Sequence, residues 1–482
     1  MSEPVYPPLK LLIDGEWISA SERETLPVEN PSTGETIGAL PVATREDVNR
    51  AIDAAQRTFD SWRRTDPRHR VAILRKAAGL IRSRVKEMVT LMALEQGKPL
   101  RDGPAEVNRA AEHFEWHAEM SLRIFGEVIP SPAGVSQMAT RIPVGPVAAF
   151  SPWNGPGASP ARKMAAALAA GCTLVIKPAE ETPATALAIA ECLVEAGLPA
   201  GVLNVVFGNP VEISDQLIAS PAIRMLSFTG SVPVGRSLAA KAGQYLKPMI
   251  LELGGHAPVI VCSDTDPLSA ARVSALTKYR NAGQICISPT RFYVHESIYD
   301  RFIDAFIETA EALVVGDPLS AETQMGPMIH NRRLSAVDEL IQDAVSRGAT
   351  LRTGGHRIGN KGAFYAPTVL TDIPESARIW HEEPFGPVAL FRRFNSLEEA
   401  CALANATSYG LASYAFTSSA DAIAMINDSV EAGGLSINQF VGASPELPFG
   451  GVKDSGYGRE GGAQCFDGYL TYKSISHKIS TQ

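Results

Sequence analysis

The sequence VGPVAAF at residues 144–150 begins a series of five short apolar runs that decides the fold class. The other four read TLVIK at 173–177, VLNVVF at 202–207, RMLSF at 224–228 and MILEL at 249–253. Amphipathic or alanine-rich stretches typical of helices lie between them, at 161–170, 183–196, 211–219 and 234–242. Strands and helices that alternate through short crossovers predict a doubly wound α/β fold, a parallel sheet with helices on its faces.

The chain on either side of this region adds further elements. Two helical stretches are expected at 46–63 and 68–96, where they would cover one face of the sheet. A second series of strands and helices follows Pro258 and includes a helix at 299–313, and its size predicts a separate lobe. The segments 123–141 and 469–479 are expected to be extended, with exposed edges that favour pairing.

Length and composition restrict the class of protein. A chain of 482 residues predicts two to four domains, and 45% hydrophobic with 20% charged residues is typical of an ordered globular protein. A formal net charge of -8 makes nucleic acid an unexpected partner. The first ten residues resemble neither a secretory signal nor a transit peptide, and no apolar run is long enough to span a bilayer. The six cysteines are scattered, which favours a reducing cytoplasm over a disulfide framework.

One glycine pattern imitates a nucleotide-binding signature. Gly456, Gly458 and Gly461 match Gly-x-Gly-x-x-Gly, but no predicted strand precedes them and only 21 residues follow. A βαβ unit does not fit in that length. We therefore interpret 456–461 as a glycine-rich loop that closes onto another domain.

Two other segments are better candidates for binding a dinucleotide. The segment 227–235, SFTGSVPVG, runs from a strand end into a helix, where free N–H groups and the helix dipole favour an anion. Lys177-Pro-Ala-Glu180 ends a neighbouring strand, and a carboxylate there can accept from ribose hydroxyls while it repels a 2′-phosphate. Each segment alone could be an ordinary turn. Together they favour a dinucleotide, and NAD over NADP.

Two residues have the chemistry of a base and a nucleophile. Glu252 ends an apolar strand beside two glycines, where partial burial would raise the pKa of its carboxyl. Cys286 follows a glycine-containing turn, and a thiolate there could attack a carbonyl carbon. A buried, inert cysteine is the alternative, and residue spacing does not decide between them.

Taken together and in order, these segments resemble the aldehyde dehydrogenase superfamily over nearly the whole chain. The resemblance rests on seven motifs, each weak alone and highly specific as a set: Pro152-Trp153-Asn154, Lys177-Pro-Ala-Glu180, Phe228-Thr-Gly230-Ser231, Leu251-Glu252-Leu253-Gly254-Gly255, Asn281-x-Gly-Gln-x-Cys286, Glu383-Pro-Phe385-Gly-Pro and Pro448-Phe-Gly-Gly451-Val-Lys-x-Ser-Gly.

The resemblance implies a mechanism without a metal. Cys286 would attack the aldehyde carbon, and the Asn154 amide with the Cys286 backbone N–H would hold the oxyanion of the thiohemiacetal. After hydride transfer to the nicotinamide, water deprotonated by Glu252 would hydrolyse the thioester to a carboxylic acid. The presence of Glu252 favours water over coenzyme A as the acyl acceptor.

The resemblance also implies where the cofactor NAD binds. The adenosine and pyrophosphate half would be lined by Trp153, Lys177, Glu180, Gly230, Ser231 and Gly235. The nicotinamide half would be held by Leu253, Glu383 and Phe385, with Glu383 accepting from its ribose.

Within the superfamily the chain looks most like the succinate-semialdehyde dehydrogenases. Arg162 and Arg280 would clamp a distal carboxylate, and Ser444 would assist them. Ordinary ion pairs are the alternative role for each arginine. Gly155 stands where the family commonly has Phe, so the pocket could instead admit a bulkier or aromatic aldehyde. Ser288 stands where some relatives carry a second cysteine, so no disulfide switch is expected there.

The resemblance implies three domains and an oligomer. An NAD-binding domain would comprise 1–122 and 142–251, and a catalytic domain would comprise 252–450. An extension built from 123–141 and 451–482 would mediate homodimers or homotetramers. A catalytically silent NAD-binding relative is disfavoured because Cys286, Asn154 and Glu252 are all present. A cysteine-dependent esterase without redox chemistry is the other alternative.

Overall fold

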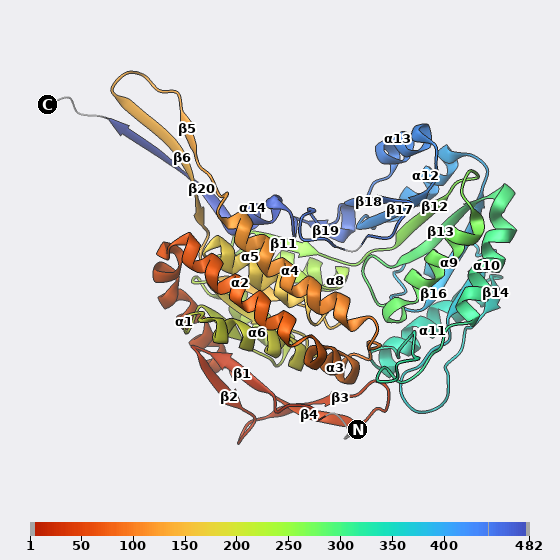
Figure 1. Cartoon of the computed structure of the whole chain (residues 1–482), viewed down its shortest axis with the longest axis horizontal. Coiled ribbons are helices and arrows are strands. Elements are labelled where there is room, and N and C mark those ends of the chain that lie inside the picture. Colours follow the sequence, from red (N-terminus) through yellow and green to blue (C-terminus); the bar gives the residue numbers. More distant parts are fainter. Residues whose placement is uncertain (1–4, 442, 479–482) are drawn as a thin grey trace.

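Two sheets of mostly parallel strands, each covered by helices, form two lobes of the protein (Figure 1). The computed structural model describes residues 5–441 and 443–478. Each lobe has its own hydrophobic core, and the two cores divide between Leu253 and Ala257. No helix within the described residues is long and apolar enough to cross a membrane.

The first lobe is built on an eight-stranded sheet in the order β19-β11-β10-β7-β8-β9-β1-β2. The five predicted strands form its parallel centre: β7 (Val147–Phe150), β8 (Leu174–Lys177), β9 (Leu203–Val205), β10 (Met225–Thr229) and β11 (Met249–Glu252). The antiparallel strands at its sides are β1 (Lys10–Ile13), β2 (Glu16–Ser19) and β19 (Gly456–Tyr457). The central strands are buried along their whole length, which explains why their sequences are mostly apolar.

Helices cover this sheet as predicted, with two differences. They are α1 (Arg45–Arg64), α2 (Pro67–Ser83), α3 (Val85–Glu95), α4 (Gly103–Ser121), α5 (Ala158–Ala170), α6 (Pro183–Ala196), α7 (Pro210–Ala219) and α8 (Val232–Gln244). The single helix predicted at 68–96 is two helices, because the backbone leaves helical geometry at Arg84 (φ -106°, ψ 17°). Helix α4 was not predicted, and it packs against α2 and α5.

The second lobe has a seven-stranded sheet in the order β14-β15-β16-β13-β12-β17-β18. Its strands are β12 (Ala257–Val261), β13 (Pro289–His295), β14 (Thr350–Thr353), β15 (Thr368–Thr371), β16 (Val388–Phe394), β17 (Ala412–Phe416) and β18 (Gly434–Ile437). Its helices are α9 (Pro267–Lys278), α10 (Tyr299–Glu311), α11 (Asn331–Ser346), α12 (Leu397–Asn405) and α13 (Ala420–Ser429). Helix α10 confirms the helix predicted at 299–313. Its Phe306 ring packs against that of Phe292 in β13, with 5.2 Å between the ring centres. The two lobes together confirm the α/β class.

A three-stranded arm projects from the first lobe (Figure 1). It consists of β5 (Glu127–Ile129), β6 (Val135–Pro143) and β20 (Leu470–Lys478). Strand β20 runs antiparallel to β6 from Leu470 opposite Pro143 to Lys478 opposite Val135. Residues 127–141 and 470–478 of the two segments predicted to be extended therefore lie in the arm, whereas Tyr469 ends a short helix. Residue 479 of that prediction lies outside the described residues. A separate hairpin is formed by β3 (Thr25–Glu29) and β4 (Thr36–Pro41).

After β18 the chain returns to the first lobe before it enters the arm. Strand β19 pairs with β11, which places Gly456 opposite Glu252. The short helix α14 (Phe466–Tyr469) follows, and the first hydrophobic core includes Cys465, Phe466, Tyr469 and Leu470. Among the described residues of the segment 451–482 expected to form the extension, only those of β20 lie in the arm. The glycine pattern at 456–461 closes onto the first sheet, as its interpretation as a closing loop expected.

Candidate active site

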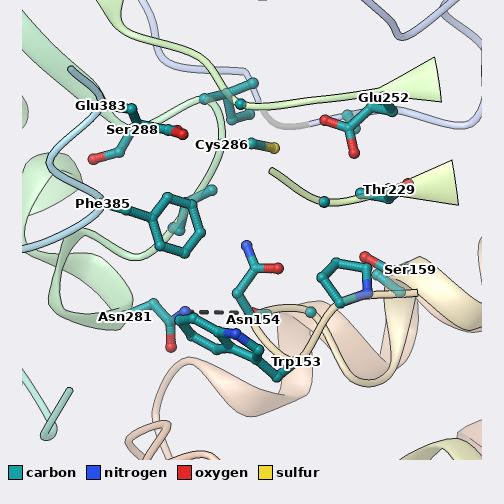
Figure 2. A pocket seen from close by; sticks show the side chains of 18 of the residues that line it. Trp153, Asn154, Ser159, Thr229, Glu252, Asn281, Cys286, Ser288, Glu383 and Phe385 are labelled. Atoms are coloured by element: carbon teal, nitrogen blue, oxygen red, sulfur yellow. Dashed lines mark hydrogen bonds between the residues drawn. The ribbon is translucent and has the colours of Figure 1, made fainter. Parts of the chain in front are cut away.

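A cavity of about 920 Å³ is lined by residues of both lobes. It lies at the carboxyl ends of β7, β10 and β11, where parallel sheets commonly bind ligands. The first lobe contributes Trp153 and Asn154 after β7, Thr229 to Pro233 after β10, and Glu252 at the end of β11. The second lobe contributes Cys286, Glu383 and Phe385. Every sequence motif except Lys177-Pro-Ala-Glu180 thus contributes residues to this cavity (Figure 2).

Cys286 lies in the loop between α9 and β13. The loop begins with three consecutive residues in the left-handed region, Asn281 (φ 51°), Ala282 (φ 52°) and Gly283 (φ 70°). The cysteine is half-buried and its sulfur points toward Glu252 (Figure 2). Burial, and next the negative charge of Glu252, raise the pKa of the Cys286 thiol well above its ordinary value. The resting thiol is therefore protonated and requires a base before it can act as a nucleophile.

Glu252 has the properties of that base. Its side chain is only 2% exposed, and one carboxylate oxygen has no hydrogen-bond partner among the described residues. Burial, and then the charge of Glu460, raise the pKa of Glu252 to about 7. A carboxyl group with that pKa can both accept and release a proton near neutral pH.

Asn154 lies on the opposite side of the cysteine. Its amide extends toward Cys286 (Figure 2), and Nδ2 donates to the carbonyl oxygen of Gln284 at 3.1 Å. An amide NH₂ group has two hydrogens. One is engaged by the nucleophile loop, and the other can reach an oxygen that forms beside Cys286.

Glu383 and Phe385 form the end of the cavity expected to hold the nicotinamide. Glu383 Oε1 accepts from the Gly255 N–H at 3.0 Å, and burial raises the pKa of Glu383 to about 8. A side chain at Gly254 would collide with the same carboxylate. The Phe385 ring meets Trp153 edge-on at 5.5 Å between ring centres. The absence of a side chain at Gly254 therefore lets the Glu383 carboxylate approach the backbone that follows β11.

The segment expected to bind phosphates lies on the same wall. Gly230 and Ser231 line the cavity where α8 begins, and no side chain caps that helix. Its free N–H groups and its dipole suit an anion such as a pyrophosphate. Gly235 lies one turn into α8 and contacts Leu253, so its lack of a side chain lets the helix pack on the strand end.

Lys177 and Glu180 lie at the end of β8, outside the lining of the cavity. Their side chains form an ion pair, and Glu180 also accepts from the Gly208 N–H at 3.4 Å. A ribose beyond the cavity would meet these two groups at the end of the neighbouring strand.

The three residues expected to bind a substrate carboxylate are not equivalent. Arg162 lines the cavity, but its guanidinium is buried and donates to Glu460 at 3.0 Å while it lies 4.8 Å from the Phe449 ring. Arg280 lines the cavity with a half-exposed side chain, 3.9 Å from Asp102. Ser444 is not part of the lining, and its hydroxyl donates to Glu446.

The sequence reasoning missed several residues of the site. Glu460 is buried and pairs with both Arg162 and Lys163, although it lies inside the glycine pattern judged irrelevant to nucleotides. The adjacent cations Arg162 and Lys163 in the alanine-rich helix α5 could have indicated such a residue, because buried charges require a partner of opposite charge. Arg109 also lines the cavity from the unpredicted helix α4. Gln96 contacts Asn154 and Asn281 from the turn after α3, and nothing in the spacing of residues indicated it.

Comparisons with known proteins agree with this geometry. The model of the aldehyde dehydrogenase family matches residues 17–475. The chain is 46% identical to the 4-(hydroxymethyl)benzenesulfonate dehydrogenase TsaD1 of Comamonas testosteroni, over 99% of this chain and all of that protein. It is 39% identical to a 3-sulfolactaldehyde dehydrogenase of Pseudomonas putida, over 98% of both chains.

A solved structure shows the same similarity in three dimensions. The succinate-semialdehyde dehydrogenase of Burkholderia pseudomallei superposes with a TM-score of 0.96 at 39% identity, and the match covers 99% of this chain and all of that one. Both the sequence and the fold are therefore shared over essentially the full length. The chain belongs to the aldehyde dehydrogenase family, whose members are oxidoreductases.

Proposed function

We propose that the protein oxidises an aldehyde to a carboxylic acid through a thioester on Cys286, with a nicotinamide dinucleotide as hydride acceptor. The observation that carries this proposal is the convergence of Cys286, Asn154 and Glu252 on one cavity. A protonated thiol, a buried carboxylate whose pKa is about 7 and an amide donor are the three groups that the reaction needs.

The chain's own groups account for each proton and charge. Glu252 accepts the proton of the Cys286 thiol, and the sulfur bonds to the aldehyde carbon. The oxyanion that forms is held by Asn154 Nδ2 and the Cys286 N–H. A dinucleotide held between the start of α8 and Glu383 would supply the hydride acceptor, and loss of the hydride from that carbon would leave Cys286 as a thioester. Glu252 loses its first proton to solvent and then takes a proton from water, whose oxygen displaces the sulfur and releases the acid. That second proton returns from Glu252 to the Cys286 thiolate.

We propose NAD as the preferred dinucleotide. The residues fit such a cofactor: the uncapped start of α8 suits the pyrophosphate, and Glu383 can accept from the nicotinamide ribose. Glu180 with Lys177 would face the adenosine ribose, and the carboxylate disfavours a 2′-phosphate. A kcat/KM higher with NADP than with NAD would contradict this assignment.

We propose that the aldehyde carries a distal anionic group. The arginines Arg109 and Arg280 line the cavity with partly exposed guanidiniums. The three relatives named above are described by substrates that share a sulfonate or a carboxylate. Arg280 keeps its expected role here and Arg109 joins it, whereas Arg162 is already neutralised by Glu460 and Ser444 lies outside the cavity lining.

The shape of the cavity favours an aromatic anionic aldehyde over succinate semialdehyde. Gly155 provides no side chain at the mouth, and the walls include the rings of Phe440, Phe449 and Tyr414. A volume of about 920 Å³ accommodates a dinucleotide's reactive end together with a ring-sized substrate. Stacking and edge contacts with these side chains would hold an aryl group.

The deciding experiment combines a substrate panel with one variant. The purified protein is mixed with NAD and succinate semialdehyde, 4-formylbenzoate, 4-formylbenzenesulfonate or benzaldehyde, and NADH is followed in time. We expect a burst of NADH, abolished by Cys286→Ala, and the highest kcat/KM for a charged aryl aldehyde. Ester hydrolysis without any NADH would instead identify an esterase, and retained turnover by the variant would exclude the cysteine mechanism.

We further propose a homodimer or homotetramer in the reducing cytoplasm. Strands β5 and β20 are the two outer strands of the arm. Val128 on β5 is 84% exposed and Tyr472 on β20 is 67% exposed. Exposed strand edges of this kind are suited to pairing with a second copy. All six cysteines are free thiols, as expected in a reducing compartment. Light scattering of the wild type and of Tyr472→Asp tests the assembly, and we expect a smaller particle for the variant.

A further inference from the structure

We infer that Gln96 is a positioning residue that holds the oxyanion-binding asparagine and the nucleophile turn together across the two lobes. The inference rests on the proposed function, since it assigns Gln96 a role toward Asn154 and Cys286. Gln96 is itself 1% exposed and is not part of the cavity lining, so it acts through other residues.

The side-chain amide of Gln96 joins the two lobes at one atom. Its Nε2 donates to Asn281 Oδ1 at 2.7 Å and to the backbone oxygen of Asn154 at 3.2 Å. Asn154 belongs to the first lobe, and Asn281 begins the left-handed turn that leads to Cys286 in the second. One NH₂ group therefore fixes the distance between the amide expected to bind the oxyanion and the loop that carries the nucleophile.

The orientation of the Gln96 amide is unambiguous. Both atoms that face Nε2 are oxygens that can only accept, so only the NH₂ group can occupy this position. The other amide atom, Oε1, is buried without a hydrogen-bond partner among the described residues. An unsatisfied buried acceptor costs about 1–3 kcal/mol. The unsatisfied Oε1 is therefore unfavourable for stability, while both N–H groups of Gln96 donate to Asn154 and Asn281.

The turn that Gln96 contacts is itself strained. Asn281 and Ala282 are non-glycine residues with φ of 51° and 52°, and such a conformation costs about 1–2 kcal/mol per residue. The Asn281 side chain opposes this strain through Nδ2, which donates to Gln284 O at 3.1 Å and to Asn154 O at 3.3 Å. Figure 2 marks the bond to Asn154. Gln96 is the donor to the remaining atom of that side chain, Oδ1. Loss of this bond would free the turn to relax and to move Cys286 relative to Asn154.

The segment that carries Gln96 is held rigidly between the lobes. Gly97 has φ of 81°, and a Cβ there would lie 2.6 Å from Pro327 of the second lobe. The Leu100 N–H donates to Pro318 O at 3.0 Å. Because the backbone is fixed on both sides, the Gln96 side chain is presented from a stable base.

Gln96→Glu tests the inference with an isosteric change. The carboxylate has no hydrogen to donate, and it faces two acceptor oxygens instead. We expect the rate of the NADH burst to fall roughly 10–100-fold, below the ~10²–10³-fold loss on removal of an oxyanion donor itself. The KM for NAD should stay within about twofold, because Gln96 does not touch the cofactor end of the cavity. Lower pH, which protonates the introduced carboxylate and restores one donor, should narrow the gap between the variant and the wild type.

Gln216→Glu is the matched control. Gln216 Nε2 likewise donates to a backbone oxygen, of Arg45 at 2.7 Å, and to an asparagine, Asn49 Oδ1 at 2.6 Å, but far from the cavity. A burst rate for Gln96→Glu equal to that of this control would overturn the inference. Equal loss of burst rate and NAD affinity without pH rescue would also overturn it, since that pattern indicates a merely structural role. If Gln96→Glu does not fold, Gln96→Met is measured in the same way and must show the same selective loss.

The same experiments separate this inference from the proposed function. A wild-type burst that disappears in Cys286→Ala supports the function, whatever Gln96→Glu does. A wild type without a burst contradicts the function itself. A normal burst in both the wild type and Gln96→Glu contradicts only the role of Gln96.

Discussion

Arg162 donates from Nη1 to Glu460 Oε2 at 3.0 Å, although the two residues are 298 positions apart. The other oxygen of Glu460 accepts from Lys163 Nζ at 2.6 Å, and all three side chains are almost completely buried. One carboxylate therefore faces two cations behind Glu252. Lys163 also donates to Ser227 Oγ at 2.9 Å, and Arg162 Nε lies 3.4 Å from His113 Nε2. This cluster is the main electrostatic feature that the sequence did not indicate.

Removal of the carboxylate should destabilise the first lobe. Glu460→Ala leaves two buried cations without a partner, and breaking a buried pair costs about 3–5 kcal/mol. Urea unfolding followed by circular dichroism measures the shift, with Glu446→Ala, an exposed glutamate, as control. A decrease in the free energy of unfolding of less than about 1 kcal/mol relative to the control would show that the cluster contributes little to stability.

The hydrolysis of the thioester should depend on the ionisation of Glu252. The carboxylate is the active form, and because burial raises its pKa to about 7, the rate should rise with pH and level off above that value. The rate at which the thioester is hydrolysed in a single turnover, measured between pH 5.5 and 9, tests this pH dependence. A rate that does not change across pH 7 would exclude Glu252 as the base.

Substitution of Glu252 should slow both half-reactions. Glu252→Gln keeps the shape of the side chain but can take a proton neither from the Cys286 thiol nor from water. We expect the NADH burst to form more slowly but to keep an amplitude of one per site while deacylation is limiting, and steady-state turnover to fall about 10²–10⁴-fold. An unchanged steady-state rate, with deacylation shown to be limiting, would contradict the assignment.

The rim arginines should select for charged substrates. Arg109→Met and Arg280→Met should each raise KM for 4-formylbenzoate about tenfold, since a charged hydrogen bond contributes about 1.5–3 kcal/mol and exposure weakens it. KM for benzaldehyde should change little, which makes it the internal control. Equal effects on both aldehydes would exclude recognition of the anion at the rim.

Gly254 should be needed for the position of Glu383. A methyl group at this position collides with the Glu383 carboxylate, which must then move away from the Gly255 N–H. Gly254→Ala should raise KM for NAD about tenfold, which corresponds to the loss of roughly one hydrogen bond. Gly243→Ala in α8 is the control, because a Cβ there meets no atom within 4 Å. Equal KM values for the two variants would contradict the role of the glycine.

Much of the fold could be predicted because burial on both faces leaves a plain mark on the sequence. The strands β7, β8, β10 and β11 are buried at every residue, so each is mostly apolar without polar residues in alternation. The break at Arg84 left no mark, since neither Gly nor Pro is present there. Helix α4 was missed for a different reason: its buried face includes His113 and His117, so its sequence lacks a continuous apolar stripe.

Only the site residues that lie within sequence motifs could be predicted. Cys286, Glu252 and Asn154 lie within short patterns, and the structure places them on one cavity. Gln96 and Glu460 act on those residues from remote parts of the chain, and such contacts exist only after folding. Arg162 illustrates the limit, because its position in the sequence suited a substrate ligand, whereas its neutralisation depends on a residue 298 positions later.

The return of the chain from the second lobe to the first also has a consequence for biosynthesis. Lys163 leaves the ribosome 297 residues before Glu460, which is about 15–60 s earlier at a synthesis rate of about 5–20 residues per second. During that interval the nascent first lobe contains two cations at core positions, lacks the edge strand β19 and lacks the residues of α14. The first lobe therefore cannot complete its native core during translation of its own segment, and its final folding step follows synthesis of the second lobe.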